Sequence, residues 1–432
     1  MQVDDRPAVS RHADDERSPE LFGLAAALAG VLGTKLPVAI DCYDGSRLGP
    51  ADATTRIIVH SAKAARYVLT APGELGFARA YVAGEIDVEG DIFEALQLRD
   101  LLPNVRVTPR EWLALARAIG VSSLRLMPVP REEARIHGRL HSKARDAAAI
   151  SHHYDVSNVF YELVLGPSMT YSCAVFTDPD SSLEDAQAAK YELVARKLGL
   201  RPGMRMLDVG CGWGGMVMHA ARHHGVDAVG VTLSRRQAEY ATKAVSDAGL
   251  ADRVEIRVQD YRDVHDGPFD AVSSIGMFEH VGLSRLDEYF SDLFMLLRPR
   301  GRLLNHGIAR VPGRSKLARR GFIHRYVFPD GELHPIGTVV SRIQRAGFEV
   351  RHVEGLREHY RKTLRHWVSN LESQWDEAIA EVGMGRARVW RLYMAASACN
   401  FEAGRTEIHQ VLAVKNDAAG RNGLPLRPDW GS

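Results

Sequence analysis

Residues 207–215 have the sequence LDVGCGWGG, and the fold prediction starts from them because they combine an acid with four glycines. They overlap the end of a short apolar segment, residues 205–209, and precede a segment with helical spacing, residues 216–224. Glycine at a strand-to-helix turn lets the backbone approach a ligand and directs the first N–H groups of the helix toward it. The stretch therefore predicts a nucleotide-binding loop in an α/β protein.

Strands and helices are predicted to alternate beyond this loop. The expected strands are residues 205–209, 228–233, 254–258, 270–275 and 302–305, and the expected helices are residues 216–224, 235–248 and 286–297, the last ending in a turn at residues 298–301. Such alternation predicts βαβ units and a parallel sheet covered by helices on both faces. A late strand, residues 407–414, follows two long helical segments, residues 358–382 and 386–399, and is expected to complete the sheet as an edge strand.

Composition and charge restrict the class of protein. The chain has 432 residues, of which 45% are apolar and 25% charged, which is typical of two or three globular domains. A net charge of +1 argues against nucleic acid as the partner. The longest apolar stretch, residues 21–33, is shorter than the ~20 residues that span a bilayer, and residues 1–17 lack the apolar core of a signal peptide. We therefore expect a cytoplasmic protein.

The overall neutrality hides two basic segments. Nine lysines and arginines stand against four acids between residues 101 and 150, and residues 310–325 hold six basic residues and no acid. These segments indicate an anionic surface as partner, either phosphate headgroups or nucleic acid, although a solvated charged face is the ordinary explanation. Residues 1–140 are expected to form a small α+β domain with strands at residues 38–42 and 56–60, and residues 141–432 are expected to form the α/β domain.

Cysteine and histidine spacing gives no metal or disulfide signal. The four cysteines lie far apart without a CxxC pair, and no HExxH pattern occurs among the 18 histidines. We therefore expect neither a disulfide framework nor a metal site, and each thiol has to be interpreted by itself.

Two classes of nucleotide cofactor fit the glycine loop. Gly210, Gly212 and Gly215 satisfy G-x-G-x-x-G, the pattern of dinucleotide-binding folds. That class expects an acid about 20 residues later at the end of the second strand, where this chain has Thr-Leu-Ser at residues 232–234. Asp208 instead precedes the first glycine, as in S-adenosylmethionine-dependent methyltransferases. A methyl donor is therefore favoured over a nicotinamide cofactor and over a purely structural turn.

Further motifs occur in a fixed order along the chain. They are residues 153–158 (HYDVSN), 169–174 (MTYSCA), 208–214, 230–234 (GVTLS) with Gln237, 274–282 (SIGMFEHVG), 306–308 (HGI), and 359–360 (HY) with 363–364 (TL), Trp367 and Phe401. From about residue 145 onward the chain thus resembles the cyclopropane fatty acid synthases, within the wider group that includes mycolic acid cyclopropane synthases. The resemblance implies a doubly wound, mostly parallel, seven-stranded methyltransferase sheet, with a smaller N-terminal domain that binds lipid.

The resemblance also implies a reaction. A cyclopropane-fatty-acyl-phospholipid synthase transfers a methylene from S-adenosylmethionine to the cis double bond of an unsaturated phospholipid acyl chain. Methyl transfer leaves a carbocation, so the site must exclude water and hold a base that removes one proton from the new methyl group. The family implies bicarbonate as that base, held by Cys173, Glu279, His306 and Tyr360. Glu279 is expected to follow the fourth strand and His306 to end the fifth, at the edge of the sheet where α/β folds bind ligands.

Each of these residues also has an ordinary structural interpretation. Cys173 lies in an apolar, aromatic stretch and could be a small buried hydrophobe, and Tyr360 could be a packing residue of an amphipathic helix. Gln237 with Ser234 matches a helix capping box. The residues expected to contact the donor are Asp208, Gly210, Gly212 and Gly214 on its methionine and ribose side, Tyr171 and Ser172 over it, Thr232 and Gln237 at the ribose, and Asp260 and Tyr261 at the adenine.

Two alternatives to ring closure stay open. The carbocation could be quenched differently, giving a 10-methylene, methyl-branched or hydroxy-methyl chain, or the protein could bind lipid without catalysis. The expected partners are the inner face of a phospholipid bilayer, to which the protein would bind peripherally, and its unsaturated acyl chains. A second copy of the chain, with which it would form a homodimer, is a further candidate partner.

Overall fold

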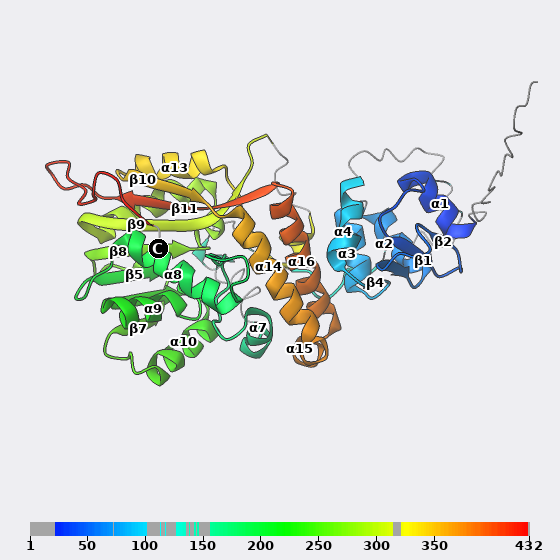
Figure 1. Cartoon of the computed structure of the whole chain (residues 1–432), viewed down its shortest axis with the longest axis horizontal. Helices are drawn as coiled ribbons and strands as arrows, with labels where there is room; N and C mark the ends of the chain where they lie inside the picture. Colours follow the sequence, from blue (N-terminus) through cyan, green and yellow to red (C-terminus); the bar gives the residue numbers. More distant parts are fainter. Residues whose placement is uncertain are drawn as a thin grey trace, which may run out of the picture. The chain divides into compact units, whose positions relative to one another are not determined.

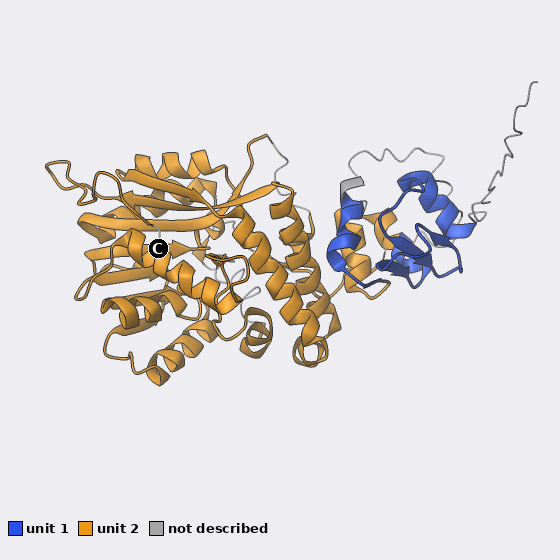
Figure 2. Ribbon diagram, viewed as in Figure 1, with its two compact units in different colours: residues 1–65, 87–125 blue, residues 66–86, 126–432 orange. Residues whose placement is uncertain are grey.

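The computed structural model of the chain describes residues 22–71, 73–101, 127–134, 156–313 and 321–430, with isolated positions between 113 and 146. The chain divides into two compact units, which are coloured separately in Figure 2. The smaller unit lies within Met1–Ala65 and Asp87–Arg125, and the larger unit comprises Arg66–Ile86 and Leu126–Ser432. Most of the basic segment at residues 106–145, residues 153–155 of the HYDVSN motif and residues 314–320 lie outside the described residues.

A four-stranded sheet forms near the N-terminal end, in the order β2-β1-β3-β4. Its strands are β1 (Ala39–Cys42), β2 (Arg47–Leu48), β3 (Arg56–Val59) and β4 (Ile86–Glu89), and the helices beside them in the chain are α1 (Gly23–Leu32), α2 (Ala62–Thr70) and α4 (Ile92–Leu101). The strands predicted at residues 38–42 and 56–60 are therefore confirmed. Asp44 in the β1–β2 turn accepts a hydrogen bond from the backbone N–H of Leu24 at 2.7 Å, which ties the start of α1 to this sheet.

The larger unit is built on a seven-stranded sheet in the order β10-β11-β9-β8-β5-β6-β7 (Figure 1). The strands are β5 (Arg205–Val209), β6 (Asp227–Thr232), β7 (Val254–Val258), β8 (Phe269–Ile275), β9 (Leu297–Arg310), β10 (Glu349–Gly355) and β11 (Thr406–Val414). Strands β9, β8, β5, β6 and β7 pair in parallel, and β11 is antiparallel to both β9 and β10. The predicted doubly wound, mostly parallel, seven-stranded sheet is confirmed.

The prediction that residues 407–414 form an edge strand is wrong. β11 lies between β9 and β10, and β10 is the edge strand. β10 has no counterpart among the predicted strands, and its residues, EVRHVEG, are all at least partly exposed. Because an edge strand with so little burial carries no strong apolar alternation, its pattern does not stand out from a loop.

β9 is longer than the predicted strand in both directions. Residues 298–301, expected to form a turn, lie within it where its register with β8 shifts. Parallel pairing with β8 stops at Ile275 and His306, but antiparallel pairing with β11 continues to Arg310. His306 therefore lies inside β9 and not at its end, because β11 extends the hydrogen-bonded ladder.

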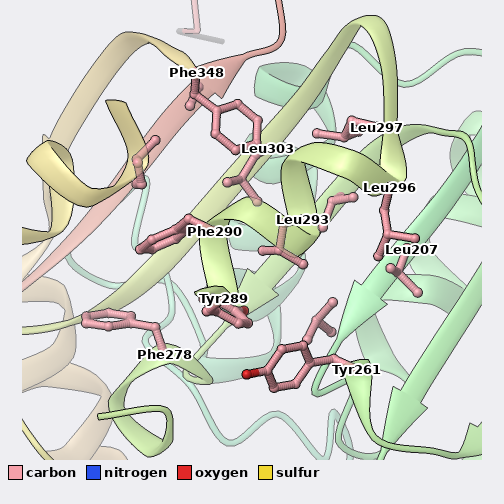
Figure 3. Packing of buried hydrophobic residues seen from close by; sticks show 14 of the residues in the cluster. Leu207, Tyr261, Phe278, Tyr289, Phe290, Leu293, Leu296, Leu297, Leu303 and Phe348 are labelled. Carbon is pink, nitrogen blue, oxygen red and sulfur yellow. The ribbon is translucent and has the colours of Figure 1, made fainter. Parts of the chain in front are cut away.

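Helices cover both faces of the sheet, as its buried parallel strands require. One face packs against α8 (Leu183–Leu198), α9 (Gly215–His224) and α10 (Arg235–Asp247). The other face packs against α11 (Leu286–Leu296) and α13 (Ile336–Arg345). Figure 3 shows the second cluster, in which Phe290 and Leu293 of α11 meet Leu303 of β9 and Leu207 of β5.

The described part of the larger unit contains further helices. They are α3 (Glu74–Val82), α7 (Asn158–Leu165), α12 (Phe322–Tyr326), α14 (Arg357–Ser373), α15 (Trp375–Val382) and α16 (Met384–Glu402), with short 3-10 turns η3 (Tyr261–Asp263), η4 (Phe278–His280) and η5 (Leu283–Arg285). The helix predicted at residues 358–382 is interrupted at Gln374. Arg388 of α16 donates to the carbonyls of Tyr81 and Ile86 at 2.8 and 3.1 Å, which fastens residues 66–86 to the larger unit. None of the helices in the described ranges is long and apolar enough to cross a membrane.

Candidate active site

The glycine loop joins β5 to α9 and lines a pocket at the carboxyl ends of β5, β6 and β8. Gly210, Gly212 and Gly214 have φ angles of 77°, 57° and 87°, in the region that favours glycine. Gly210 and Gly212 line the pocket. Gly214 does not: a Cβ there would lie 3.1 Å from the Cβ of Ala241, so this glycine lets α9 begin close against α10.

Two buried charged side chains line this pocket, Asp208 at the end of β5 and Lys190 in α8. Lys190 is 0% exposed; its Nζ donates to Ser172 Oγ at 3.2 Å and lies 3.5 Å from the centre of the Tyr191 ring. Asp208 accepts a hydrogen bond from Ser273, and neither charge has an ion-pair partner among the described residues. Burial raises the pKa of Asp208 to about 6 and lowers the pKa of Lys190 to about 7, although their mutual attraction opposes both effects. The pocket thus offers one cation and one anion to a ligand.

The end of β6 brings Thr232 and Gln237 to the pocket wall. The backbone N–H of Gln237 donates to Ser234 Oγ at 3.2 Å, so Ser234 caps α10. The side chain of Gln237 contacts Thr232, because the Thr232 hydroxyl donates to Gln237 Oε1 at 2.9 Å. Both side chains therefore lie where the sequence predicts a ribose contact.

Asp260 and Tyr261 follow β7, but only Tyr261 lines the pocket. The Tyr261 ring meets the Tyr289 ring edge-on, with the ring centres 4.9 Å apart. Figure 3 labels both rings. The carboxylate of Asp260 accepts hydrogen bonds from Nε and Nη2 of Arg262 at 2.8 and 2.6 Å. Burial alone would raise the pKa of Asp260, but these bonds outweigh it and lower the pKa. The Asp260 carboxylate is therefore engaged with Arg262, and its contact with the adenine stays a prediction.

Tyr171 lines the pocket and belongs to an aromatic cluster. Its ring lies 5.2 Å from that of Trp367 and 5.7 Å from that of Trp390. Tyr161 joins the cluster at 5.9 Å from Tyr171 and packs 4.6 Å from Trp213 of the glycine loop. Aromatic faces attract cations and their bulk excludes water, so this wall suits a reaction that passes through a positive charge.

Glu279 lies in η4, directly after β8, and is 8% exposed. Its Oε1 accepts a hydrogen bond from the backbone N–H of Ile308 at 2.6 Å, whereas Oε2 is buried without a partner in the described part of the chain. Burial raises its pKa to about 7. Gly307 permits this close approach, because a Cβ there would lie 1.9 Å from Phe278 Cε1 and 3.1 Å from Glu279 Oε1.

His306 is not among the residues that line this pocket, but its carbonyl accepts a hydrogen bond from the N–H of Gly276, a lining residue, at 2.8 Å. The His306 ring is buried, with Nδ1 3.2 Å from Gln410 Nε2 and with Nε2 unpartnered among the described residues. Burial, reinforced by the charges of Lys190 and Lys197, holds its pKa well below the ordinary value. The ring is therefore neutral at physiological pH.

Cys173 and Tyr360 meet at the carbonyl of Leu356. The thiol of Cys173 lies 3.7 Å from this oxygen, and the N–H of Tyr360 donates to it at 3.1 Å. Leu356 in turn donates to Ile408 of β11, which pairs with Ile308 of β9, the residue that binds Glu279. Burial raises the pKa of the Cys173 thiol far above its ordinary value, so it stays protonated. None of the four predicted catalytic residues is among those that line the pocket, and their joint catalytic role stays a prediction.

Lys190 is the pocket residue that sequence reasoning missed. Gln187, Lys190 and Lys197 all lie among the buried residues of α8, at positions where an amphipathic helix ordinarily carries apolar side chains. Burying a lysine is costly unless a partner compensates its charge. Polar residues on the buried stripe of a helix were therefore the signal that was available.

A cluster of histidines and a carboxylate also forms outside the pocket. Glu192 of α8 and His219 and His224 of α9 bring donor atoms within 4.8 Å of one another. Glu192 also accepts a hydrogen bond from Arg196 at 2.9 Å, so an arginine already balances its charge. The observed contacts fasten α8 to α9, and the spacing of these residues in the sequence did not reveal them.

The fold and the pocket define a class of enzyme. A doubly wound seven-stranded sheet with an antiparallel β11, and a glycine loop preceded by an acid after its first strand, are the features of an S-adenosylmethionine-dependent methyltransferase. Residues 141–411 match the family model described as mycolic acid cyclopropane synthetase, and the chain belongs to this family.

Two relatives are similar in sequence to this chain over most of its length. A probable fatty acid methyltransferase of Mycobacterium tuberculosis is 50% identical over 405 residues, which are 91% of this chain and 95% of that protein. A probable fatty acid methyltransferase of Pseudomonas putida is 42% identical over 396 residues, covering 90% and 95%. The solved structure of mycolic acid cyclopropane synthase CmaA1 in complex with SAH and CTAB superposes with a TM-score of 0.59 at 35% identity, covering 62% of this chain and 98% of that chain.

Proposed function

We propose that the chain is a cyclopropane-fatty-acyl-phospholipid synthase, which adds a methylene from S-adenosylmethionine to the cis double bond of an unsaturated phospholipid acyl chain. One observation carries this proposal: Glu279 Oε2 and His306 Nε2 are buried with no partner in the described residues, on side chains next to the pocket-lining residues His280 and Gly276. Buried polar atoms are nearly always hydrogen-bonded, so each of these atoms can accommodate a small polar ligand. The names of the relatives support a fatty acyl substrate.

The pocket fits S-adenosylmethionine by charge. The amino-acid end of the donor carries both a carboxylate and an ammonium group. Lys190, with Ser172, is suited to the carboxylate, and Asp208 is suited to the ammonium group. Thr232 and Gln237 offer polar groups for the ribose hydroxyls, and Tyr261 offers a face for the adenine.

The reaction requires no covalent intermediate between the protein and the substrate. Bound S-adenosylmethionine supplies a methyl group on a sulfonium, and bound bicarbonate would supply a base. The π electrons of the alkene form the new bond as the carbon–sulfur bond breaks, which leaves a cation on the neighbouring acyl carbon. One proton then leaves the new methyl group, and the electrons of that C–H bond close the ring. The protein must align the alkene, surround the cation with aromatic rings and exclude water.

The four candidate catalytic residues suit a small anion because all four can donate a hydrogen bond. The thiol of Cys173, the hydroxyl of Tyr360 and the ring of His306 are donors. Glu279 becomes one when protonated, and its pKa of about 7 makes that form abundant at neutral pH. This removes the repulsion between a glutamate and bicarbonate.

Membrane attachment is proposed for the N-terminal part of the chain and the two basic segments. The family model starts at residue 141, whereas the Mycobacterium tuberculosis relative matches 91% of the chain. The match therefore extends well into residues 1–140, and the two relatives that match 90% and 91% of the chain are both named as probable fatty acid methyltransferases. An anionic leaflet attracts clustered lysines and arginines, so residues 106–145 and 310–325 would hold the enzyme peripherally on the inner face.

The test incubates purified protein with labelled S-adenosylmethionine and vesicles of unsaturated phospholipid, followed by mass spectrometry and proton NMR of the acyl chains. We expect a mass gain of one CH₂ and the high-field signals of a cyclopropane ring. Vinylidene signals would show a 10-methylene product, and an added methyl and hydroxyl group would show a hydroxy-methyl product. Unchanged acyl chains, together with a calorimetric titration that shows no donor binding, would support a lipid-binding protein without activity.

A further inference from the structure

Three polar side chains form a row across neighbouring strands of the main sheet. Glu354 of β10 is paired with Gln410 of β11, and Gln410 is paired with His306 of β9. Residues directly opposite one another in antiparallel strands point to the same face of a sheet, so these three side chains lie side by side. Lys197, from the last turn of α8, joins the row: it forms an ion pair with Glu354 and donates to Gln410 Oε1 at 2.7 Å.

Lys197 fixes the orientation of the Gln410 amide. An ammonium group can only donate hydrogen bonds, so the amide oxygen must face it. The reversed amide would place NH₂ against the ammonium group. Both side chains are completely buried, so bulk water does not offer either of them another partner. The NH₂ group of Gln410 is thereby directed at His306 Nδ1, 3.2 Å away.

A donor facing Nδ1 determines the tautomer of His306. A neutral imidazole carries one proton, and a nitrogen that accepts from an amide NH₂ cannot hold it. The proton must then reside on Nε2, the ring nitrogen that is buried without a partner among the described residues. We infer that Lys197 and Gln410 are positioning residues that hold His306 in the Nε2–H tautomer, so that its buried Nε2 is a hydrogen-bond donor.

Glu354 completes the arrangement. Its carboxylate is about one third exposed, and it balances the charge of the buried Lys197. Burial lowers the pKa of Lys197, and the ion pair with Glu354 opposes that effect. The role of the Nε2–H donor rests on the proposed function, in which it binds the small anion that serves as base. The tautomer itself is a property of the free protein and does not depend on that function.

The experiment measures the tautomer directly by long-range ¹H–¹⁵N NMR of the histidine rings, in the full-length protein at neutral pH. The His306 signals are assigned by their loss in a His306→Asn variant. We expect a protonated Nε2 and an unprotonated Nδ1 in the wild-type protein. A protonated Nδ1 in the wild-type protein would overturn the inference.

Gln410→Glu is the decisive variant because it has nearly the same shape. Its carboxylate would accept from both Lys197 and His306, so Nδ1 must become a donor, either as the other neutral tautomer or in an imidazolium ring. Lys197→Met should free the amide to turn and give a mixture of tautomers. Lys415→Met is the matched control: it removes a lysine that donates to the carbonyls of Phe294 and Leu297 just beyond β11, and it should leave the His306 signals unchanged.

Donor binding and turnover are then measured on the same variants. Gln410→Glu should bind S-adenosylhomocysteine as the wild-type protein does, by calorimetry, and should lose about 10- to 100-fold in turnover, as replacing a residue that orients a ligand-binding histidine typically does. A changed tautomer with unchanged turnover would overturn the role of the donor. A wild-type protein without cyclopropanation would refute the proposed function, while the NMR result would still decide whether Lys197 and Gln410 set the tautomer.

Discussion

The carboxyl group of Glu279 has a pKa of about 7 because it is buried and receives only one hydrogen bond, from Ile308. The folded protein therefore holds this proton more tightly than the unfolded chain, whose glutamates titrate near 4.5. The stability that the proton contributes is complete below pH 4.5 and is lost as the pH rises through about 7. At about 1.4 kcal/mol per pH unit, the loss is on the order of 3 kcal/mol.

Glu279→Gln should accordingly become more stable than the wild-type protein as the pH rises, because glutamine does not titrate. Urea unfolding at pH 5 and pH 8 measures the difference in the free energy of unfolding between the two proteins. Glu239→Gln, on the exposed side of α10, provides the control and should show no such trend. A difference that stays constant between the two pH values would contradict the burial argument.

Lys190→Met should weaken donor binding through a specific group of the donor. A charge-assisted hydrogen bond contributes about 1.5–3 kcal/mol, which corresponds to about 10- to 100-fold in affinity. Calorimetry compares S-adenosylhomocysteine with an analogue that lacks the carboxylate, and only the former should lose affinity in the variant. Lys243→Met, at an exposed lysine of α10, is the control. Equal losses for both compounds would show that Lys190 supports the fold of the pocket and not the carboxylate.

Residues of the site that belong to a sequence motif could be predicted, whereas site residues outside any motif could not. Asp208, Glu279 and His306 stand in ordered motifs: Asp208 lines the pocket, Glu279 contacts Ile308 of β9, and His306 lies in β9. Lys190 and Lys197 stand in a helix whose pattern looks amphipathic, and their function depends on which strand residues lie beneath them. That pairing is a long-range contact, which local sequence does not encode.

At the scale of elements, η4 must press against β9 for Glu279 to reach Ile308. Gly307→Ala should disturb this contact, because the new Cβ would overlap the ring of Phe278. Overpacking of this kind costs typically about 1–3 kcal/mol, so we expect a lower melting temperature together with a loss of turnover. Gly337→Ala in α13 is the matched control, because a Cβ there meets nothing within 4 Å. A Gly307→Ala variant as stable and as active as the control would show that η4 can move without consequence.

The burial and pairing of each element explain which elements could be predicted from the sequence. Strands β5, β6 and β8 are buried and apolar, and they were predicted at their places in the chain. β10 was not, because an edge strand can remain polar, and the inner position of β11 depends on β10 pairing outside it. The extension of β9 past His306 likewise follows from its pairing with β11. The order and length of these strands depend on which strands pair with each other. The periodicity of a single segment carries no information about that pairing.

At the scale of the whole molecule, net charge and local charge make different predictions about membranes. A chain of net charge +1 has no general attraction to an anionic bilayer, so any such attraction must come from its basic segments. Residues 314–320 carry four of these cations and lie outside the described residues. The contribution of these cations to membrane binding can therefore be tested by removing their charges.

Binding of the full-length protein to vesicles that contain anionic phospholipid should fall steeply between dilute and molar salt, because screening shortens the range of each attraction. Replacing Lys316, Arg319 and Arg320 by glutamine removes three cations, each of which contributes about 1 kcal/mol near the surface, so affinity should fall on the order of 100-fold. The control replaces Lys243, Arg345 and Arg421, which are exposed and lower the net charge equally. Co-sedimentation that is indifferent to salt, or equal losses in both triple variants, would show that the basic segments are ordinary solvated surface and that the enzyme reaches its acyl chains by another route.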